Sequence, residues 1–169
     1  MKKALRCSGI VVALLVEIAT LLLQFGHALT MTNKTNGASN KYFGQDILFV
    51  YSTASSYGVS RHEPSRTAIF VFIFMSLLGF AFFVSFILSL KDNQSSNAWS
   101  GLIILLSALG LLVCFICIFF IPYSWKYADK DNYITTLGGD YVAASILAIA
   151  GSIISIPVAI INFKSAIHE

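Results

Sequence analysis

Glu17 is the residue of this chain that is best placed to take part in chemistry. It lies in the middle of an apolar run, and three polar residues follow it at steps of three, four and three: Thr20, Gln24 and His27. Residues three and four apart share a helix face, so these four predict an intramembrane polar stripe. A charged carboxylate at the centre of a bilayer costs about 2.5–3.5 kcal/mol, so we expect Glu17 to be protonated, paired or facing water.

The stripe has three interpretations. It can form a path for ions or protons, or it can contact a helix of a partner protein. The plainest interpretation is structural, with a protonated Glu17 bonded to serines of a neighbouring helix.

Cys114 and Cys117 form a CxxC pair, the spacing that thiol oxidoreductases use. Such an enzyme needs a second cysteine pair at the membrane surface to pass electrons, and the only other cysteine is Cys7. The pair also lies inside an apolar run rather than at a helix start, where a thiolate would be stabilised. We therefore expect these cysteines to pack, and keep thiol redox catalysis as a remote alternative. Cys7, near the inner interface, is a candidate for palmitoylation.

Motifs of other enzyme classes are missing from the sequence. It contains no HExxH, P-loop or GxSxG pattern, and its three histidines are widely separated. We expect no enzyme activity, no cofactor and no metal site.

Four long apolar stretches carry these residues: 9–29, 67–90, 99–121 and 140–161. Each can span a hydrocarbon core about 30 Å thick at about 1.5 Å per helical residue. The composition agrees, since 57% of residues are hydrophobic and 11% are charged. We predict an all-α membrane protein in which residues 1–169 form one four-transmembrane-helix bundle. The net charge of +3 is too scattered for a nucleic-acid partner.

The first stretch also has the charge pattern of a signal peptide, with Lys2, Lys3 and Arg6 before it. It is longer than a usual signal core, and no clean cleavage site follows it. We expect a retained helix.

Basic residues predict the orientation of the bundle. Five of them are concentrated in short segments on one side, and six are spread over longer segments on the other. We therefore expect cytoplasmic termini, outer loops at 30–66 and 122–139, an inner turn at 91–98, and a position in the plasma membrane. Asn33-Lys34-Thr35 is then an outer glycosylation sequon at Asn33, and a second sequon at Asn93 lies inside.

The first outer loop has strand character. Residues 42–51 are rich in aromatic and β-branched types, and residues 52–58 have the composition of a turn. A second run at 57–60 can pair with the first, which predicts a small extracellular hairpin or sheet. Its exposed apolar side chains would form a contact strand: Tyr42, Phe43, Ile47, Phe49 and Tyr51.

Small residues predict where the helices pack, because lipid gives no hydrophobic drive for helix association. Two helices carry them at helical spacing: Gly110 and Cys114 in the third, and Ala144, Ala148, Gly151 and Ser152 in the fourth.

With this topology, the chain resembles the claudin and peripheral myelin protein superfamily of tetraspan proteins. Arg66-Thr67-Ala68 is similar to the start of that family's second helix, and Gly138-Gly139-Asp140-Tyr141 is similar to the start of its fourth. The family's first loop carries a tryptophan and two cysteines, whereas residues 30–66 here contain neither residue type. The resemblance implies a structural or accessory protein that packs against another integral membrane protein or itself. It does not extend to tight-junction strands, and a small ion channel or transporter built on the Glu17 stripe is the alternative.

Overall fold

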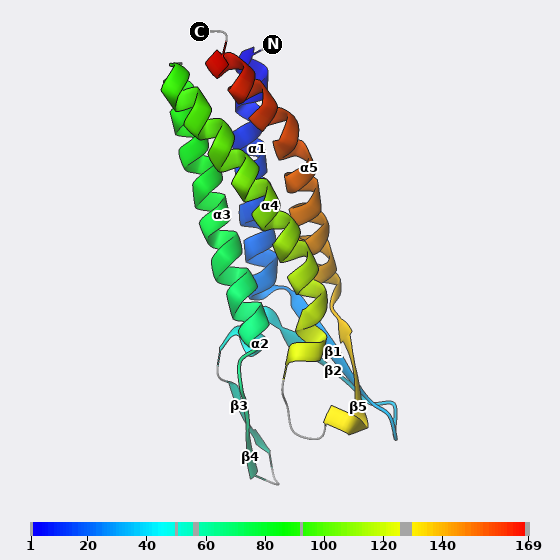
Figure 1. The fold of residues 1–169 in the computed structure, drawn as a ribbon. Coiled ribbons are helices and arrows are strands. Elements are labelled where there is room, and N and C mark those ends of the chain that lie inside the picture. Colours follow the sequence, from blue (N-terminus) through cyan, green and yellow to red (C-terminus); the bar gives the residue numbers. More distant parts are fainter. Residues whose placement is uncertain (1, 50, 56–57, 92, 126–129, 168–169) are drawn as a thin grey trace.

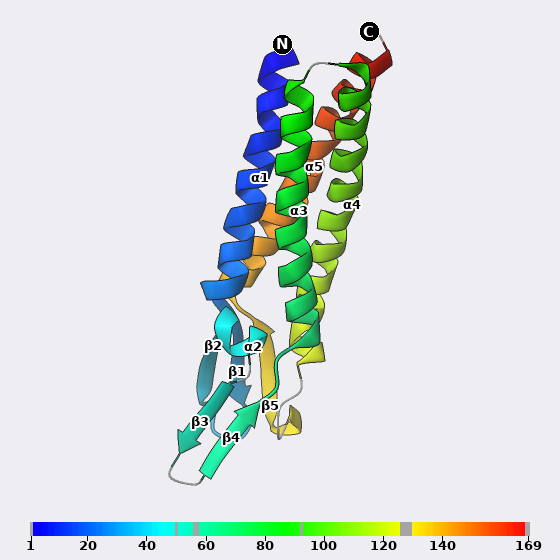
Figure 2. The same cartoon turned by 90° about the vertical axis from the view of Figure 1, so that its left-hand side faces the viewer.

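Four long helices form a bundle in the computed structural model (Figure 1). The structure describes residues 2–49, 51–55, 58–91, 93–125 and 130–167, with side chains from residue 9 onward except 50–62 and 130. The helices are α1 (Lys2–Phe25), α3 (Arg66–Leu90), α4 (Gln94–Ser124) and α5 (Gly139–Ile167). They pack in a ring in the order α1, α3, α4, α5 and back to α1. Both termini lie at one end of the bundle and the strands at the other (Figure 2).

Three of these helices, α3, α4 and α5, are long and apolar enough to cross a membrane, with 25, 31 and 29 residues. Helix α1 contributes a shorter apolar segment, Gly9–Phe25. The outer surfaces of the bundle carry large apolar side chains, such as Phe80 and Leu106, which a soluble protein would bury. This is the architecture of a helical membrane protein.

Helix α4 runs beyond its predicted span, 99–121, at both ends. The turn between α3 and α4 shrinks to residues 91–93, because Asn93 caps α4 by accepting a hydrogen bond from the Ser96 backbone N–H at 2.7 Å. Helix α4 then continues past Pro122 to Ser124. The predicted limits were too short because a helix need not end where its apolar residues end.

The prediction that the first helix reaches residue 29 is wrong. Helix α1 ends at Phe25, and β1 (His27–Asn33) begins two residues later. Strand β1 is the centre of an antiparallel sheet with the order β2-β1-β5, formed with β2 (Ser39–Phe43) and β5 (Tyr133–Leu137). The apolar run continues to Leu29 because Ala28 and Leu29 are fully buried as strand residues.

The predicted strand at 42–51 is also wrong. A short helix, α2 (Gly44–Leu48), follows β2, and the Asp46 carboxylate stabilises its start by accepting a hydrogen bond from the Phe43 backbone N–H at 2.8 Å. Gly44 donates its backbone N–H to the Gly26 carbonyl at 2.9 Å, and a Cβ at Gly44 would collide with the last turn of α1. Most of the predicted turn at 52–58 is strand instead, in a separate hairpin of β3 (Tyr51–Ser55) and β4 (Gly58–His62).

Candidate functional site

Glu17 lies on the outside of the bundle, in a groove between α1 and α3. The groove has a volume of about 350 Å³ and is otherwise apolar; its lining is Ile10, Ala13, Leu14, Glu17, Gly79, Phe80 and Phe83. The Glu17 side chain is exposed, and within the described part of the chain it forms no hydrogen bond or ion pair. Apart from Asp140, which is the first residue of the fourth stretch, it is the only Asp, Glu, Lys or Arg within the four predicted apolar stretches. The structure therefore has one carboxyl group in the middle of an apolar surface.

Gly79 of α3 allows the carboxyl group of Glu17 to lie against the helix backbone. A Cβ built on Gly79 would collide with Glu17 Oε1, and would lie 3.3 Å from Glu17 Cδ and 3.4 Å from Val16 Cγ1. Any other residue at position 79 would push the carboxyl group away from α3. The site is therefore a pair, one acid and one glycine, from facing helices.

The predicted polar stripe does not form along α1. Thr20 is buried and its hydroxyl donates to the Val16 carbonyl of its own helix at 2.9 Å, while Gln24 is half-buried. His27 is not in the helix at all. It lies in β1, its ring Nε2 is 2.9 Å from the Thr30 hydroxyl, and its backbone N–H donates to Asp140.

The contact between Glu17 and serines of the fourth span is likewise not made. Ser145 and Ser155 donate to carbonyls of their own helix, and Ser152 donates to the Ala108 carbonyl of α4 at 2.9 Å. Helix α5 packs on the other side of α1 from this groove, since the ring order separates it from α3.

Cys114 and Cys117 are free thiols, the first buried and the second half-buried. Cys114 belongs to the apolar core between the helices, where it acts as a small packing residue. The side chain of Cys7 lies outside the described residues. No group of three metal-binding side chains comes together in the part of the chain that the structure describes.

The small residues predicted to pack are all buried at helix contacts. Gly110 faces Leu78 of α3 and Gly151 faces Leu111 of α4, each too closely for a side chain to be added without a shift. The remaining members are likewise buried: Cys114, Ala144, Ala148 and Ser152.

A buried polar network at the end of the bundle that holds the termini was not predicted. Ser100 of α4 donates to the Ser85 carbonyl of α3 at 2.9 Å, and Asn162 of α5 donates to the Ser100 hydroxyl at 3.1 Å. Three helices are thereby joined by hydrogen bonds where lipid offers none. The signal in the sequence was only a set of polar residues near the span ends.

The contact strand predicted from the first outer loop is dispersed over several elements. Tyr42 packs edge-on against Trp125, with ring centroids 5.0 Å apart, and Ile47 is fully buried. Phe43 and Phe49 are exposed, at 49% and 55%. The side chain of Tyr51 lies outside the described residues.

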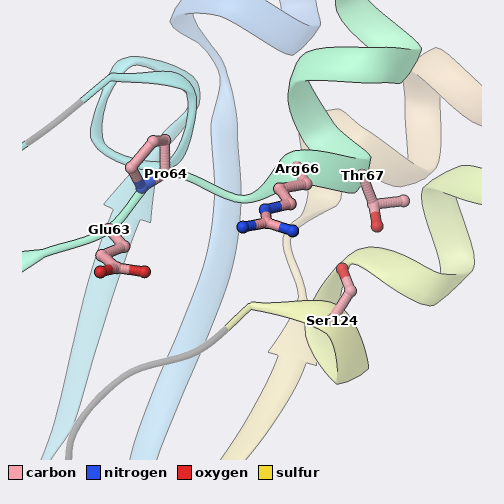
Figure 3. Close-up of a pocket in the computed structure, with 5 residues that line it drawn as sticks. All are labelled: Glu63, Pro64, Arg66, Thr67 and Ser124. Carbon is pink, nitrogen blue, oxygen red and sulfur yellow. The ribbon is translucent and has the colours of Figure 1, made fainter.

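A second cavity lies at the end of the bundle that carries the strands, where α3 begins and α4 ends. It has a volume of about 250 Å³ and is lined by Glu63, Pro64, Arg66, Thr67 and Ser124 (Figure 3). In this view the hydroxyls of Thr67 and Ser124 face each other, and the Arg66 guanidinium lies between them and Glu63. Sequence reasoning missed this cavity because its two sides come from residues about sixty positions apart.

Three contacts connect the segments at the end of the bundle that carries the strands. Trp125 is fully buried and donates its indole N–H to the Glu63 carbonyl at 2.9 Å. Tyr141 donates its hydroxyl to the Leu23 carbonyl at 2.7 Å, and Asp140 accepts the His27 backbone N–H at 2.6 Å.

Comparison with models of known protein families finds none that matches this chain, and a search of curated proteins finds no match either.

Proposed function

We propose that this chain is a non-enzymatic, claudin-like integral membrane protein that acts as a structural or accessory subunit. It packs sideways against another membrane protein and presents its outer loops to the extracellular space. The observation that carries this proposal is the carboxyl group of Glu17, which lies on the apolar outer surface of the bundle against Gly79.

In this proposal all four long helices cross the plasma membrane. The apolar part of α1, Gly9–Phe25, has 17 residues, which is at the short end of the range for a spanning helix. It also packs against both α3 and α5, two helices that are long enough to span. Lys2, Lys3 and Arg6 precede it, which favours cytoplasmic termini and extracellular strands.

The claudin-like part of the proposal rests on the arrangement of the outer segments. A bundle of four helices carries a small sheet at one end, and that sheet joins strands from both outer loops. This agrees with the strand character that the resemblance implies for the first loop. The first loop lacks the family's tryptophan and cysteines, so the proposal does not include junction strands or a paracellular pore.

Glu17 supports a lateral partner because its position is costly in lipid alone. An ionised carboxylate at mid-membrane costs about 2.5–3.5 kcal/mol, and a neutral one still has a donor and an acceptor to satisfy. A partner helix with a basic or hydrogen-bonding side chain at the same depth would remove this cost. The apolar groove around Glu17 would hold apolar side chains of that partner helix.

The two alternative functions, an ion channel or transporter and a thiol oxidoreductase, receive no specific support. An ion path within one copy needs polar groups along the interior, whereas Glu17 faces outward and Thr20 bonds to its own helix. Redox catalysis needs an accessible thiol, whereas Cys114 is buried in the core.

Site-specific photo-crosslinking in native membranes tests the proposal. A photoreactive residue replaces Leu14, which lines the groove and is 58% exposed, or Leu106 on α4, which is 59% exposed and lies across the bundle. We expect one stoichiometric integral membrane protein to crosslink to position 14 and not to position 106. The crosslink should be lost in Glu17→Leu and weakened in Glu17→Gln, while both variants still reach the membrane.

Other results would contradict this function. Equal protein crosslinks at the two positions, or crosslinks that Glu17→Leu leaves intact, would show that the groove does not select a partner. A crosslink only to a second copy of this chain would replace the foreign partner with self-association.

A further inference from the structure

The cavity at the outer end of the bundle holds two opposite charges that do not meet. Glu63 and Arg66 both line it, yet within the described residues neither forms an ion pair at 4.0 Å or less. Both side chains are exposed, and their charges remain available to a ligand in the cavity.

Hydroxyl groups complete the lining. Within the described part of the chain, Thr67 makes no hydrogen bond through its side chain, so its hydroxyl is available as a donor or an acceptor. Ser124 donates its hydroxyl to the Ile121 carbonyl at 3.1 Å and lies 3.5 Å from the Ser65 hydroxyl, so its oxygen keeps one further lone pair to accept. The cavity therefore offers a cation and a free hydroxyl for an anion, and a carboxylate and an accepting oxygen for a cation.

The backbone that carries these groups is held in place. The Ser65 backbone N–H donates to the Ile47 carbonyl at 2.7 Å, and the Ser65 hydroxyl accepts the Ala68 backbone N–H at 3.2 Å. On the other side, the Trp125 indole fixes the Glu63 carbonyl at 2.9 Å. The cavity is thus bounded by segments with defined positions, and a ligand would not have to order them.

The depth of the cavity indicates where the ligand comes from. Arg66 begins α3 and Ser124 ends α4, and both helices are long and apolar enough to cross a membrane. Residues at the ends of spanning helices lie at the level of the lipid headgroups. At the headgroup level, the ligand that carries both a negative and a positive charge is a lipid headgroup with one phosphate and one amine.

We infer that the cavity lined by Glu63, Arg66, Thr67 and Ser124 binds the headgroup of a zwitterionic aminophospholipid. The phosphate binds Arg66 and the Thr67 hydroxyl through charge-assisted hydrogen bonds. The amine lies toward Glu63 and the Ser124 oxygen. An anionic lipid without an amine satisfies Arg66 but is repelled by Glu63, so the two charges together select the headgroup.

Native mass spectrometry of the full chain in mild detergent tests this inference. Dioleoyl phosphatidylethanolamine and dioleoyl phosphatidylglycerol are added separately, and soluble phosphorylethanolamine is added in a third series. We expect the parent protein to retain the ethanolamine lipid in preference to the glycerol lipid. Arg66→Gln should lower the binding of both lipids roughly fivefold, which corresponds to about 1 kcal/mol for one basic residue at a membrane surface.

Glu63→Gln should act differently from Arg66→Gln. It should remove the preference between the two lipids while total lipid binding is kept. Lys164→Gln, which removes an exposed positive charge at the other end of the bundle, should leave both binding and preference unchanged. Both cavity substitutions replace exposed side chains, and equal melting temperatures in detergent would show that the variants are folded.

Two results would overturn the inference. If Arg66→Gln and Glu63→Gln keep the lipid profile of the parent, the cavity does not recognise headgroups. If soluble phosphorylethanolamine binds as well as the lipid at the same concentration, the ligand is a small phosphate ester and not a membrane lipid.

Discussion

The carboxyl group of Glu17 lies directly against the backbone of α3 at Gly79, where a single added carbon would displace it. The two residues come from facing helices at the middle of the bundle, and apolar side chains surround them on the outer surface. The glycine leaves the space that the carboxyl group occupies against α3.

Gly79→Ala should abolish partner binding while it leaves the stability of the protein nearly unchanged. The added Cβ meets the far end of a flexible side chain, so Glu17 can move, and alanine gains up to about 1 kcal/mol of helix propensity. We expect the free energy of unfolding in detergent to change by less than about 1 kcal/mol, while the crosslink from position 14 is lost. Gly9→Ala is the matched control, because its nearest atom is Phe86 Cβ at 4.0 Å, and it should keep the crosslink. A Gly79→Ala protein that crosslinks like the parent would refute this role of the glycine.

Trp125 should contribute to stability through both its ring and its indole N–H. Trp125→Phe removes the donor to the Glu63 carbonyl, and we expect a loss of about 0.5–1.5 kcal/mol in the free energy of unfolding. Trp125→Ala should cost about 3–5 kcal/mol, because it also leaves a cavity beside Tyr42. Circular dichroism during denaturation in detergent measures both, with Trp99→Phe at an exposed position as the control. Equal effects of Trp125→Phe and Trp99→Phe would contradict this prediction.

Asp140 should anchor the start of β1 to the start of α5. Its carboxylate accepts the His27 backbone N–H at 2.6 Å, a charge-assisted bond. Asp140→Ala leaves that N–H without an acceptor, so we expect a loss of about 1–3 kcal/mol in unfolding free energy. Asp140→Asn keeps an oxygen in place and should recover part of this loss. No difference between the two variants would show that the hydrogen bond is not what Asp140 contributes.

Asn33 should be glycosylated when the chain is made in a eukaryotic secretory pathway. It lies at the end of β1, at the tip of the β1–β2 hairpin that extends away from the bundle, and Thr35 beside it is exposed (Figure 1). Asn33→Gln should remove a glycosidase-sensitive shift in gel mobility. Asn93, in the turn at the opposite end of the bundle, is the internal control and should stay unmodified. Modification of Asn93 instead of Asn33 would reverse the proposed orientation.

The sequence predicted the helices well and the sheet β2-β1-β5 poorly, for a physical reason. A hydrophobic run in the sequence indicates burial or lipid contact. The run at 67–90, for example, predicts the bounds of α3 to within one residue. The same signal does not distinguish helix from strand, so Ala28 and Leu29 were assigned to a helix although they are buried in β1. The pairing of β1 with β5 leaves no local trace in either segment.

For the candidate sites too, the sequence identified residues that stand out locally but not positions that depend on contacts between distant segments. Glu17 was found because a lone acid in an apolar run is conspicuous, but the direction of its side chain depends on which helices flank α1. His27 was misplaced because the end of α1 depends on Gly26 and on contacts with Asp140, far along the chain. The cavity at Arg66 and Ser124 forms only when α3 and α4 lie side by side.

The pairing of β1 with β5 also sets an order of events during synthesis. Thr30 and Thr136 are partners in the sheet although they lie 106 positions apart in the sequence. Strand β1 leaves the ribosome before α3 and α4 are made, so one of its edges stays uncovered until the segment before the last helix arrives. A chain that stops before residue 133 would present that bare edge, which is a surface prone to pair with other chains. Closure of the sheet therefore requires the chain to be made through β5, so it is one of the last long-range contacts that the molecule can form during synthesis.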